Sequence, residues 1–142
     1  MVNNKFLFAI MVFLFPGQPF ADRVVKIEIE KTGIAYKGRS EVEQEGCKLF
    51  RPTEKQLIQY FNQAQRLEFG GWREHKYYSP CIVIGRVTFK EGMSGRFTLQ
   101  SSGFGYGVFN HQQINFFNEF NPWFDPFQCT YAMGDEVEPG CD

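Results

Sequence analysis

The chain has 142 residues and a formal net charge of −1, with 17 phenylalanines and 14 glycines in an otherwise ordinary globular composition. All its lysines and arginines lie at or before Arg96, whereas residues 97–142 contain six acidic side chains and no fixed positive charge. Such a region repels phosphate, which disfavours nucleic acid and anionic membranes as its ligands. It suits a basic protein partner, although a solvated acidic tail explains the pattern equally well.

The first 21 residues have the layout of a secretory signal peptide. Residues 1–5 carry one positive charge, residues 6–15 are uninterruptedly apolar, and small or turn-forming residues lead to Ala21. The apolar run is about half as long as a membrane-spanning helix, so an uncleaved anchor is the weaker alternative. We therefore expect cleavage after Ala21, a single domain of residues 22–142 without a stable membrane anchor, and a periplasmic or secreted location. The absence of an N-glycosylation sequon fits a bacterial periplasm.

Four cysteines remain in the mature chain, an even number that predicts two disulfide bonds in a small exported domain. Four cysteines allow three pairings. We favour Cys47 with Cys81 and Cys129 with Cys141, because each pair closes a loop beside a single element. A zinc site is the competing use of four cysteines, but none of them belongs to a CxxC pair.

The N-terminal part of the mature chain predicts a β-hairpin. Apolar and charged residues alternate over residues 25–30, Thr32 and Gly33 can turn the chain, and residues 34–36 can return as the second strand. A polar, acidic connector of residues 38–46 then leads to the first cysteine.

Residues 53–67 predict one amphipathic helix. Thr53 is a good N-cap, and Gln56 completes a capping box. The apolar residues that follow fall on one stripe: Leu57, Ile58, Phe61, Ala64 and Leu67. Gly70 and Gly71 are expected to end the helix. A helix with a single apolar face should lie across a sheet.

Four segments with alternating apolar and polar residues, separated by short turns, predict that sheet. They span residues 80–89, 95–101, 104–109 and 114–117. The predicted fold is an α+β domain with an N-terminal hairpin, one amphipathic helix on a four-stranded antiparallel meander, and disulfide bonds. Gly105 and Gly107 share one face of the third segment, where they either allow a close neighbour or form a ligand groove.

The sequence offers little that could catalyse a reaction. His75 and His111 lie in an expected loop and turn without metal-ligand spacing, and the cysteines are expected to be oxidised. Glu119 and Asp125 could form an acid–base pair, but Asp125 precedes a proline, where its side chain would hold a local turn. Oxygen ligands for calcium occur here without EF-hand spacing: Asn118, Glu119, Asn121 and Asp125. We expect no enzymatic activity, no cofactor and no metal.

Residues 116–131 contain seven aromatic side chains in sixteen positions and no basic residue. Aromatic platforms for nucleic acid work beside lysine and arginine, so this segment predicts protein recognition instead. A second aromatic cluster lies in residues 70–80. Most rings are expected in the core, and both tryptophans are expected to keep an exposed edge. The candidates for partner contact are Trp72, Tyr77, Tyr78, Phe120, Trp123, Phe124 and Asp125.

Residues 47–109 resemble a pattern in small exported proteins of Gram-negative bacteria. In that pattern a cysteine and a P-T-x-x-Q helix precede a strand with S-P-C-x-x-x-G-x-V-x-F, a glycine turn and an aromatic strand. The matching residues are Cys47, Thr53, Pro80, Cys81, Gly85, Phe89, Gly92 and Phe97. Proteins of this build are similar in kind to periplasmic immunity proteins, which neutralise toxins delivered between bacteria, and to small secreted enzyme inhibitors. The resemblance implies a fold and says little about chemistry.

Together these observations predict a disulfide-bonded periplasmic binding protein without catalytic activity. We expect an immunity or inhibitor protein that neutralises a basic toxin or enzyme by direct contact. The alternative is a carrier or sensor of a small apolar or sugar ligand, held in a helix–sheet pocket lined by Phe97, Phe104 and Tyr106. A small hydrolase is the third candidate. The oligomeric state is left open.

Overall fold

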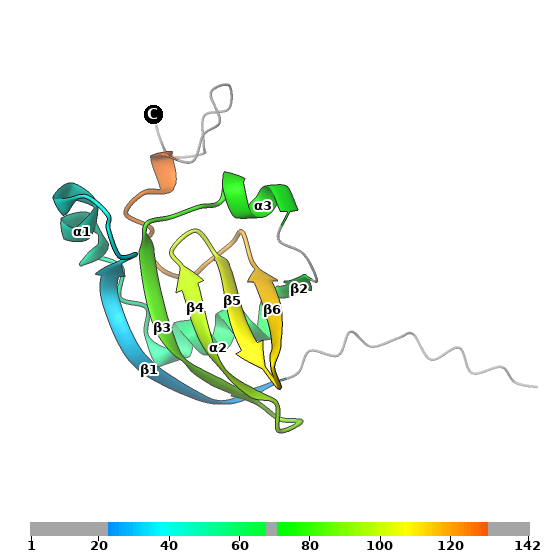
Figure 1. Cartoon of the computed structure of the whole chain (residues 1–142). Helices are drawn as coiled ribbons and strands as arrows, with labels where there is room; N and C mark the ends of the chain where they lie inside the picture. Colours follow the sequence, from blue (N-terminus) through cyan, green and yellow to red (C-terminus); the bar gives the residue numbers. More distant parts are fainter. Residues whose placement is uncertain (1–22, 68–70, 131–142) are drawn as a thin grey trace, which may run out of the picture.

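A computed structural model describes residues 23–67 and 71–130, which form an α+β domain (Figure 1). One antiparallel sheet of six strands forms a single layer, and helix α2 (Glu54–Gln63) crosses one of its faces, behind the sheet in Figure 1. The predicted signal peptide, residues 1–21, lies outside the described residues. The α+β class and the helix-on-sheet arrangement agree with the sequence prediction.

The sheet contains the predicted four-stranded meander but extends beyond it at both edges. Its strands lie in the order β1-β3-β4-β5-β6-β2. Their bounds are β1 Val24–Ala35, β2 Gln65–Leu67, β3 Cys81–Phe89, β4 Ser94–Gln100, β5 Phe104–Phe109 and β6 Gln112–Phe117. Strands β3 to β6 are the meander, while β1 pairs with β3 and the short β2 pairs with β6.

The predicted N-terminal hairpin is wrong, because β1 is a single strand of 12 residues that pairs with β3 throughout. The register shifts between Lys31 and Ile34, so the turn-forming residues produce a local irregularity and do not reverse the chain. Gly33 takes a φ of +66° at this point, and its N–H donates to the carbonyl of Phe50 at 2.9 Å. The glycine therefore lets β1 bend toward the chain that precedes α2.

Two further helices occupy segments predicted as connectors. Helix α1 (Glu41–Cys47) begins at Ser40, whose side chain forms a capping box with Glu43. Helix α3 (Gly71–Lys76) lies near the opposite edge of the sheet, and a 3₁₀ turn, η1 (Gln128–Thr130), ends the described chain.

Helix α2 begins at Thr53 with the predicted Gln56 capping box, but it ends at Gln63 and not at the glycine pair. Ala64 already has an extended backbone, and residues 65–67 pair with β6 as β2. Leu67 therefore leaves the predicted helical stripe and belongs to the sheet. Pairing with the edge of β6 replaces the last helical turns.

The core between α2 and the sheet is filled by aromatic rings. Phe61 of α2 contacts three sheet rings edge-on: Phe89 at 6.2 Å, Phe97 at 4.8 Å and Phe116 at 5.3 Å between centroids. The Phe109 ring lies against Gly107, where an added Cβ would clash with it. The bare strip predicted on β5 thus packs against a neighbouring ring and does not form a groove.

The predicted pocket between helix and sheet, lined by Phe97, Phe104 and Tyr106, is not formed, because the pairing of β4 with β5 places these residues on different faces of the sheet. Phe97 pairs with Gly107, whereas Tyr106 pairs with Thr98, and Phe104 shares the face of Tyr106. Phe104 and Tyr106 therefore point away from α2, while Phe97 points toward it. These three residues do not line one pocket.

The predicted bond between Cys47 and Cys81 is confirmed, with a Cα–Cα distance of 4.9 Å and both residues fully buried. It ties the end of α1 to the start of β3. Cys129 is also disulfide-bonded, and its predicted partner, Cys141, lies outside the described residues. Disulfide bonds are typical of an oxidising compartment outside the cytoplasm. Within residues 23–67 and 71–130, no helix is long and apolar enough to cross a membrane.

Candidate binding site

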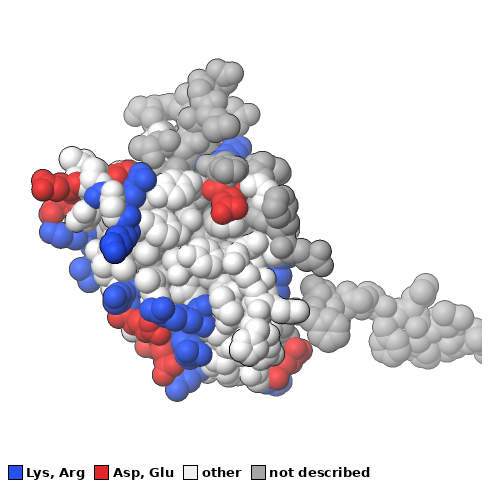
Figure 2. Space-filling model, viewed as in Figure 1, with Lys and Arg blue, Asp and Glu red and all other residues white. Residues whose placement is uncertain are grey.

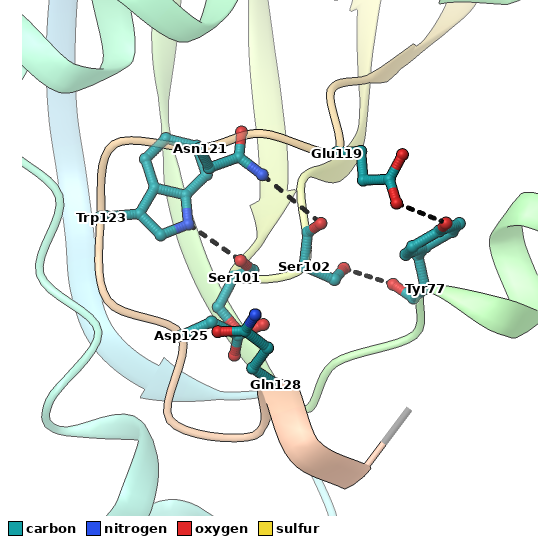
Figure 3. A pocket seen from close by; sticks show the side chains of 8 residues that line it. All are labelled: Tyr77, Ser101, Ser102, Glu119, Asn121, Trp123, Asp125 and Gln128. Atoms are coloured by element: carbon teal, nitrogen blue, oxygen red, sulfur yellow. Dashed lines mark hydrogen bonds between the residues drawn. The ribbon is translucent and has the colours of Figure 1, made fainter. Parts of the chain in front are cut away.

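A cavity of about 100 Å³ lies where β4 turns into β5 (Figure 3). Three separate segments form it: the chain after α3, the turn of residues 101–103 (the serine turn) and residues 118–128 (the aromatic loop). The lining residues are Tyr77, Ser101, Ser102, Glu119, Asn121, Trp123, Asp125 and Gln128. In Figure 3 the backbone of the serine turn passes between Trp123 on one side and Tyr77 with Glu119 on the other.

Buried hydroxyl groups fix the serine turn. The Ser79 and Ser101 hydroxyls share a hydrogen bond of 2.6 Å, and the Ser101 hydroxyl donates to Asp125 Oδ1 at 2.8 Å. The Ser102 hydroxyl donates to the carbonyl of Tyr77. Both turn serines are buried, and their hydroxyl bonds attach the turn to the aromatic loop and to the chain after α3.

Gly103 connects the serine turn to both α2 and the aromatic loop. Its carbonyl accepts hydrogen bonds from the Tyr60 hydroxyl at 2.9 Å and from the N–H of Asn118 at 3.0 Å. Its φ is +94°, and a Cβ there would clash with the backbone of Asn118. Only glycine permits this close crossing of two chain segments.

The aromatic loop is held against the domain along its length. The indole N–H of Trp123 donates to the carbonyl of Ser101 at 2.8 Å, and its ring lies 5.4 Å from Tyr60 and 5.7 Å from Phe50. The side-chain amide of Gln56 donates to the carbonyl of Pro122 at 3.0 Å. These contacts attach the middle of the aromatic loop to the serine turn and to α2.

Asp125 does hold a local turn, as its position before a proline predicts. Its Oδ1 accepts the N–H of Phe127 at 3.1 Å in addition to the Ser101 hydroxyl. This carboxylate thus has a structural role inside the pocket. No lysine or arginine is among the described residues that line the pocket.

Two rings of the aromatic loop face solvent. The side chain of Phe120 is 82% exposed and that of Phe124 is 66% exposed. Each is adjacent in sequence to a pocket carboxylate, since Phe120 follows Glu119 and Phe124 precedes Asp125. Apolar anchors and acidic groups therefore occur together in one rigid loop.

The charged residues of the domain gather elsewhere. Figure 2 shows basic and acidic side chains together around α1 and over the side of the sheet formed by β1, while the middle of this face is uncharged. Neighbouring charges pair there, as Arg96 Nε does with Glu30 at 2.9 Å. The aromatic loop differs because it has acids without any lysine or arginine.

The other predicted contact residues are dispersed. The Tyr77 ring packs against Phe117 at 4.7 Å, and its hydroxyl donates to Glu119 Oε1 at 3.3 Å. Tyr78 does not line the pocket and stacks on Tyr36 at 6.0 Å. Trp72 lies in α3, and the description does not extend to its side chain. Trp123, expected to keep an exposed edge, is partly buried against the core and lines the pocket.

Sequence reasoning did not find the serine turn or Gln128 as parts of a site, and it considered Asn121 only as a weak calcium ligand. Ser101 and Ser102 resemble any polar hairpin turn in sequence. Their role depends on the aromatic loop returning across them, which is a tertiary contact between segments about 20 residues apart. A local pattern carries no signal for it.

Among the described residues no group of three or more His, Cys, Asp or Glu side chains could hold a metal ion. His111 lies in the tight turn between β5 and β6, where it and Asn110 have positive φ angles, at the opposite end of β5 from the serine turn. His75 belongs to α3, and its side chain is outside the description.

The fold and site together define a disulfide-bonded α+β domain that presents a rigid, acidic aromatic loop beside a small polar pocket. Comparison with known proteins found no matching family model, no matching curated protein and no matching solved structure. The function therefore has to be argued from the chemistry of the loop and the pocket.

Proposed function

We propose that this protein is a non-catalytic binding protein of the bacterial periplasm, an immunity or inhibitor protein that neutralises a toxin or enzyme by direct contact. The observation that supports this most strongly is the exposure of Phe120 and Phe124 in a loop that is otherwise firmly attached. Exposed rings rimmed by polar groups are typical of protein interaction sites.

Rigidity makes such a loop effective. Binding through a mobile segment costs about 0.5–1.5 kcal/mol for each side chain that becomes ordered. Here Trp123 and Pro122 are already fixed by hydrogen bonds to Ser101 and Gln56. The two outward phenylalanines are therefore presented in advance, and little ordering remains to oppose association.

The charge of the loop favours a basic partner. Glu119 is exposed and Asp125 is partly buried, and no lysine or arginine occurs from position 97 onward. Complementary charge accelerates encounter and rejects partners of like charge. A toxin or enzyme with a basic face would meet these requirements.

The proposal places the protein in the periplasm. Disulfide bonds at Cys47–Cys81 and at Cys129 suit an oxidising environment, and the predicted signal peptide would direct the chain there. An immunity protein in the periplasm would meet its toxin before the toxin reaches its target.

The pocket is less suited to the alternative functions. Sites for small ligands usually have volumes of about 300–1,000 Å³ and mostly apolar walls, whereas this cavity measures about 100 Å³ and is largely polar. Glu119 and Asp125 do share the pocket, which keeps a hydrolase as a lower-ranked candidate. Asp125, however, is engaged by Ser101 and by the backbone of Phe127.

The product of the reading frame adjacent to this gene provides the direct test, because immunity and toxin genes are expected to be neighbours. That product is expressed in the periplasm with the wild-type chain, with a Phe120→Ala/Phe124→Ala variant, or with a Val25→Ala/Val108→Ala control that removes exposed side chains from the sheet. Growth should be protected by the wild type and the control but not by the loop variant. Equal protection by all three would contradict the proposal.

A further inference from the structure

We propose that the face of the sheet opposite α2 binds a neutral saccharide chain, which lies across β3 to β6 with one sugar ring on Tyr106. This inference goes beyond the proposed function, because it assigns a second ligand to a surface apart from the aromatic loop. Trp123 attaches that loop to Tyr60 on the α2 side of the domain. The two sites can therefore be tested separately.

The proposed site is a row of four side chains, one from each strand of the meander. Directly opposite residues of antiparallel strands point to the same face of the sheet. The strand pairing aligns the members of this row, the Tyr106 row, in the following order: Ile84, Thr98, Tyr106 and Asn115. The face away from α2 is the one seen in Figure 2, and its middle is uncharged.

The charge of this face favours a neutral ligand. Charged side chains begin further along the strands, where Arg86 pairs with Arg96. Arg96 is itself bound by Glu30 at 2.9 Å. A ligand centred on the Tyr106 row meets no fixed charge, so a charged group would lose water there without gaining a counter-ion.

Two polar groups flank the Tyr106 side chain and lack partners. Asn115 is only 9% exposed, and its Oδ1 accepts from Gln113 at 3.1 Å, whereas its Nδ2 has no hydrogen-bond partner among the described residues. The Thr98 hydroxyl likewise has no partner in the part of the chain that the structure describes. A buried amide without a partner costs free energy, which a ligand that accepts a hydrogen bond would recover.

Neighbouring side chains hold the Tyr106 ring in place. The buried side chain of Gln100 accepts the N–H of Ser79 at 2.7 Å and donates to the Tyr36 hydroxyl at 3.2 Å. The Tyr36 hydroxyl lies next to that of Tyr106, and the Tyr36 ring stacks on Tyr78 at 6.0 Å. A ring that is fixed before binding requires little further ordering.

A saccharide matches this combination of groups. A pyranose ring has an apolar C–H face, which packs on an aromatic ring, and hydroxyl groups at its rim, which donate and accept hydrogen bonds. A sugar unit extends a chain by about 5 Å, close to the spacing of about 4.8 Å between neighbouring strands. A chain lying across the strands would thus place successive units over Thr98, Tyr106 and Asn115.

The experiment titrates three tetrasaccharides into the ¹⁵N-labelled mature chain: the neutral tetra-N-acetylchitotetraose and maltotetraose, and the acidic tetragalacturonate. NMR follows the side-chain amide of Asn115 and the backbone amides of Thr98 and Tyr106. We expect saturable shifts at these signals with at least one neutral probe, and binding at least threefold weaker with the acidic one. No saturable shift with either neutral probe, or equally tight binding of the acidic probe, would overturn the assignment.

Three variants test the contacts. Tyr106→Ala should weaken binding of the neutral probe at least tenfold, because the stacking surface is removed. Thr98→Val keeps the size and the β-branching of the side chain and should weaken binding about three- to tenfold, since only the hydroxyl is lost. Val108→Ala, at an exposed position of the same face, is the matched control and should bind like the wild type. An unchanged affinity in Tyr106→Ala or in Thr98→Val would contradict the proposal.

A protein is the competing occupant of this face. If no sugar binds but Tyr106→Ala weakens binding of the product of the neighbouring reading frame, the face contacts protein and the saccharide assignment is wrong. If a neutral probe binds at the Tyr106 row but growth protection does not require Phe120 and Phe124, the proposed function is wrong and the saccharide site stands.

Discussion

The indole N–H of Trp123 donates to the main-chain carbonyl of Ser101 across a distance of 2.8 Å. This bond joins the aromatic loop to the turn between β4 and β5. The loop and the turn are separated in sequence by the hairpin of β5 and β6. Trp123 thus attaches the loop to the domain, whereas Phe120 and Phe124 remain exposed. Substitutions at neighbouring positions of the loop are therefore expected to differ in their effect on stability.

Trp123→Ala should destabilise the domain by about 2–4 kcal/mol, because it removes a partly buried ring and a hydrogen bond. Phe124→Ala, one residue further, should change the free energy of unfolding by less than about 0.5 kcal/mol, since its ring is exposed. Urea denaturation followed by circular dichroism measures both. Similar losses for the two variants would show that Trp123 does not attach the loop in this way.

Gly103→Ala should destabilise by at least about 2 kcal/mol, because its positive φ and the nearby backbone of Asn118 both exclude a Cβ. Gly92→Ala is the matched control. Its φ is +86°, but no atom lies within 4 Å of an added Cβ, so only the conformational cost of about 1 kcal/mol should appear. Thermal or urea unfolding of the two variants measures how much the contact between Gly103 and the backbone of Asn118 adds to the loss of stability. Equal losses in the two variants would show that this contact does not matter.

Removing the bond between Cys47 and Cys81 should cost about 3–4 kcal/mol of stability, the value expected from loop-closure entropy for cysteines 34 residues apart. The double variant Cys47→Ala/Cys81→Ala is compared with the oxidised wild type by urea unfolding. Val42→Ala, an exposed position on α1, should have almost no effect. A loss below about 1 kcal/mol in the double variant would mean that this bond does not constrain the unfolded chain.

Stability should fall at alkaline pH because of two tyrosines. Burial raises the pKa of Tyr60 well above its ordinary value, and burial, followed by the nearby Tyr106, raises the pKa of Tyr36. Their contribution is fully present below about pH 10, where the unfolded chain also keeps its phenols protonated. It is lost as the pH rises from there toward the folded pKa, by about 1.4 kcal/mol per pH unit for each group.

Tyr60→Phe tests this linkage. At pH 7 the variant should be about 1 kcal/mol less stable, because the hydrogen bond to Gly103 is lost. Above pH 10 its stability should decline less steeply than that of the wild type, since one protonated phenol has been removed. Urea unfolding at several pH values between 7 and 11 gives both slopes, and identical slopes would contradict the prediction.

Local chemistry in the sequence predicted the middle of the sheet and the start of α2. The alternation in β3 to β6 and the Thr53 capping box depend on neighbours within a few residues, which a sequence displays directly. The bond between Cys47 and Cys81 was chosen correctly from three pairings. The capping box of Ser40 and Glu43 is an equally local signal, but it lies in a polar, acidic segment whose composition predicts a connector.

The errors arise where a tertiary partner overrides a local signal. Gly33 looks like a turn, yet pairing with β3 keeps β1 extended through it. The apolar stripe of α2 continues to Leu67, yet the free edge of β6 draws residues 65–67 into the sheet. The pocket is a still more distant effect, because its lining comes from segments that meet only in the folded domain.

Isothermal titration calorimetry between the purified chain and the product of its neighbouring reading frame measures the role of the aromatic loop most directly. Two exposed anchors that act as hot spots contribute about 2 kcal/mol each, so Phe120→Ala/Phe124→Ala should weaken binding by roughly 1,000-fold. The Val25→Ala/Val108→Ala control should bind like the wild type. A loop variant that binds as tightly as the control would show that recognition occurs elsewhere on the domain.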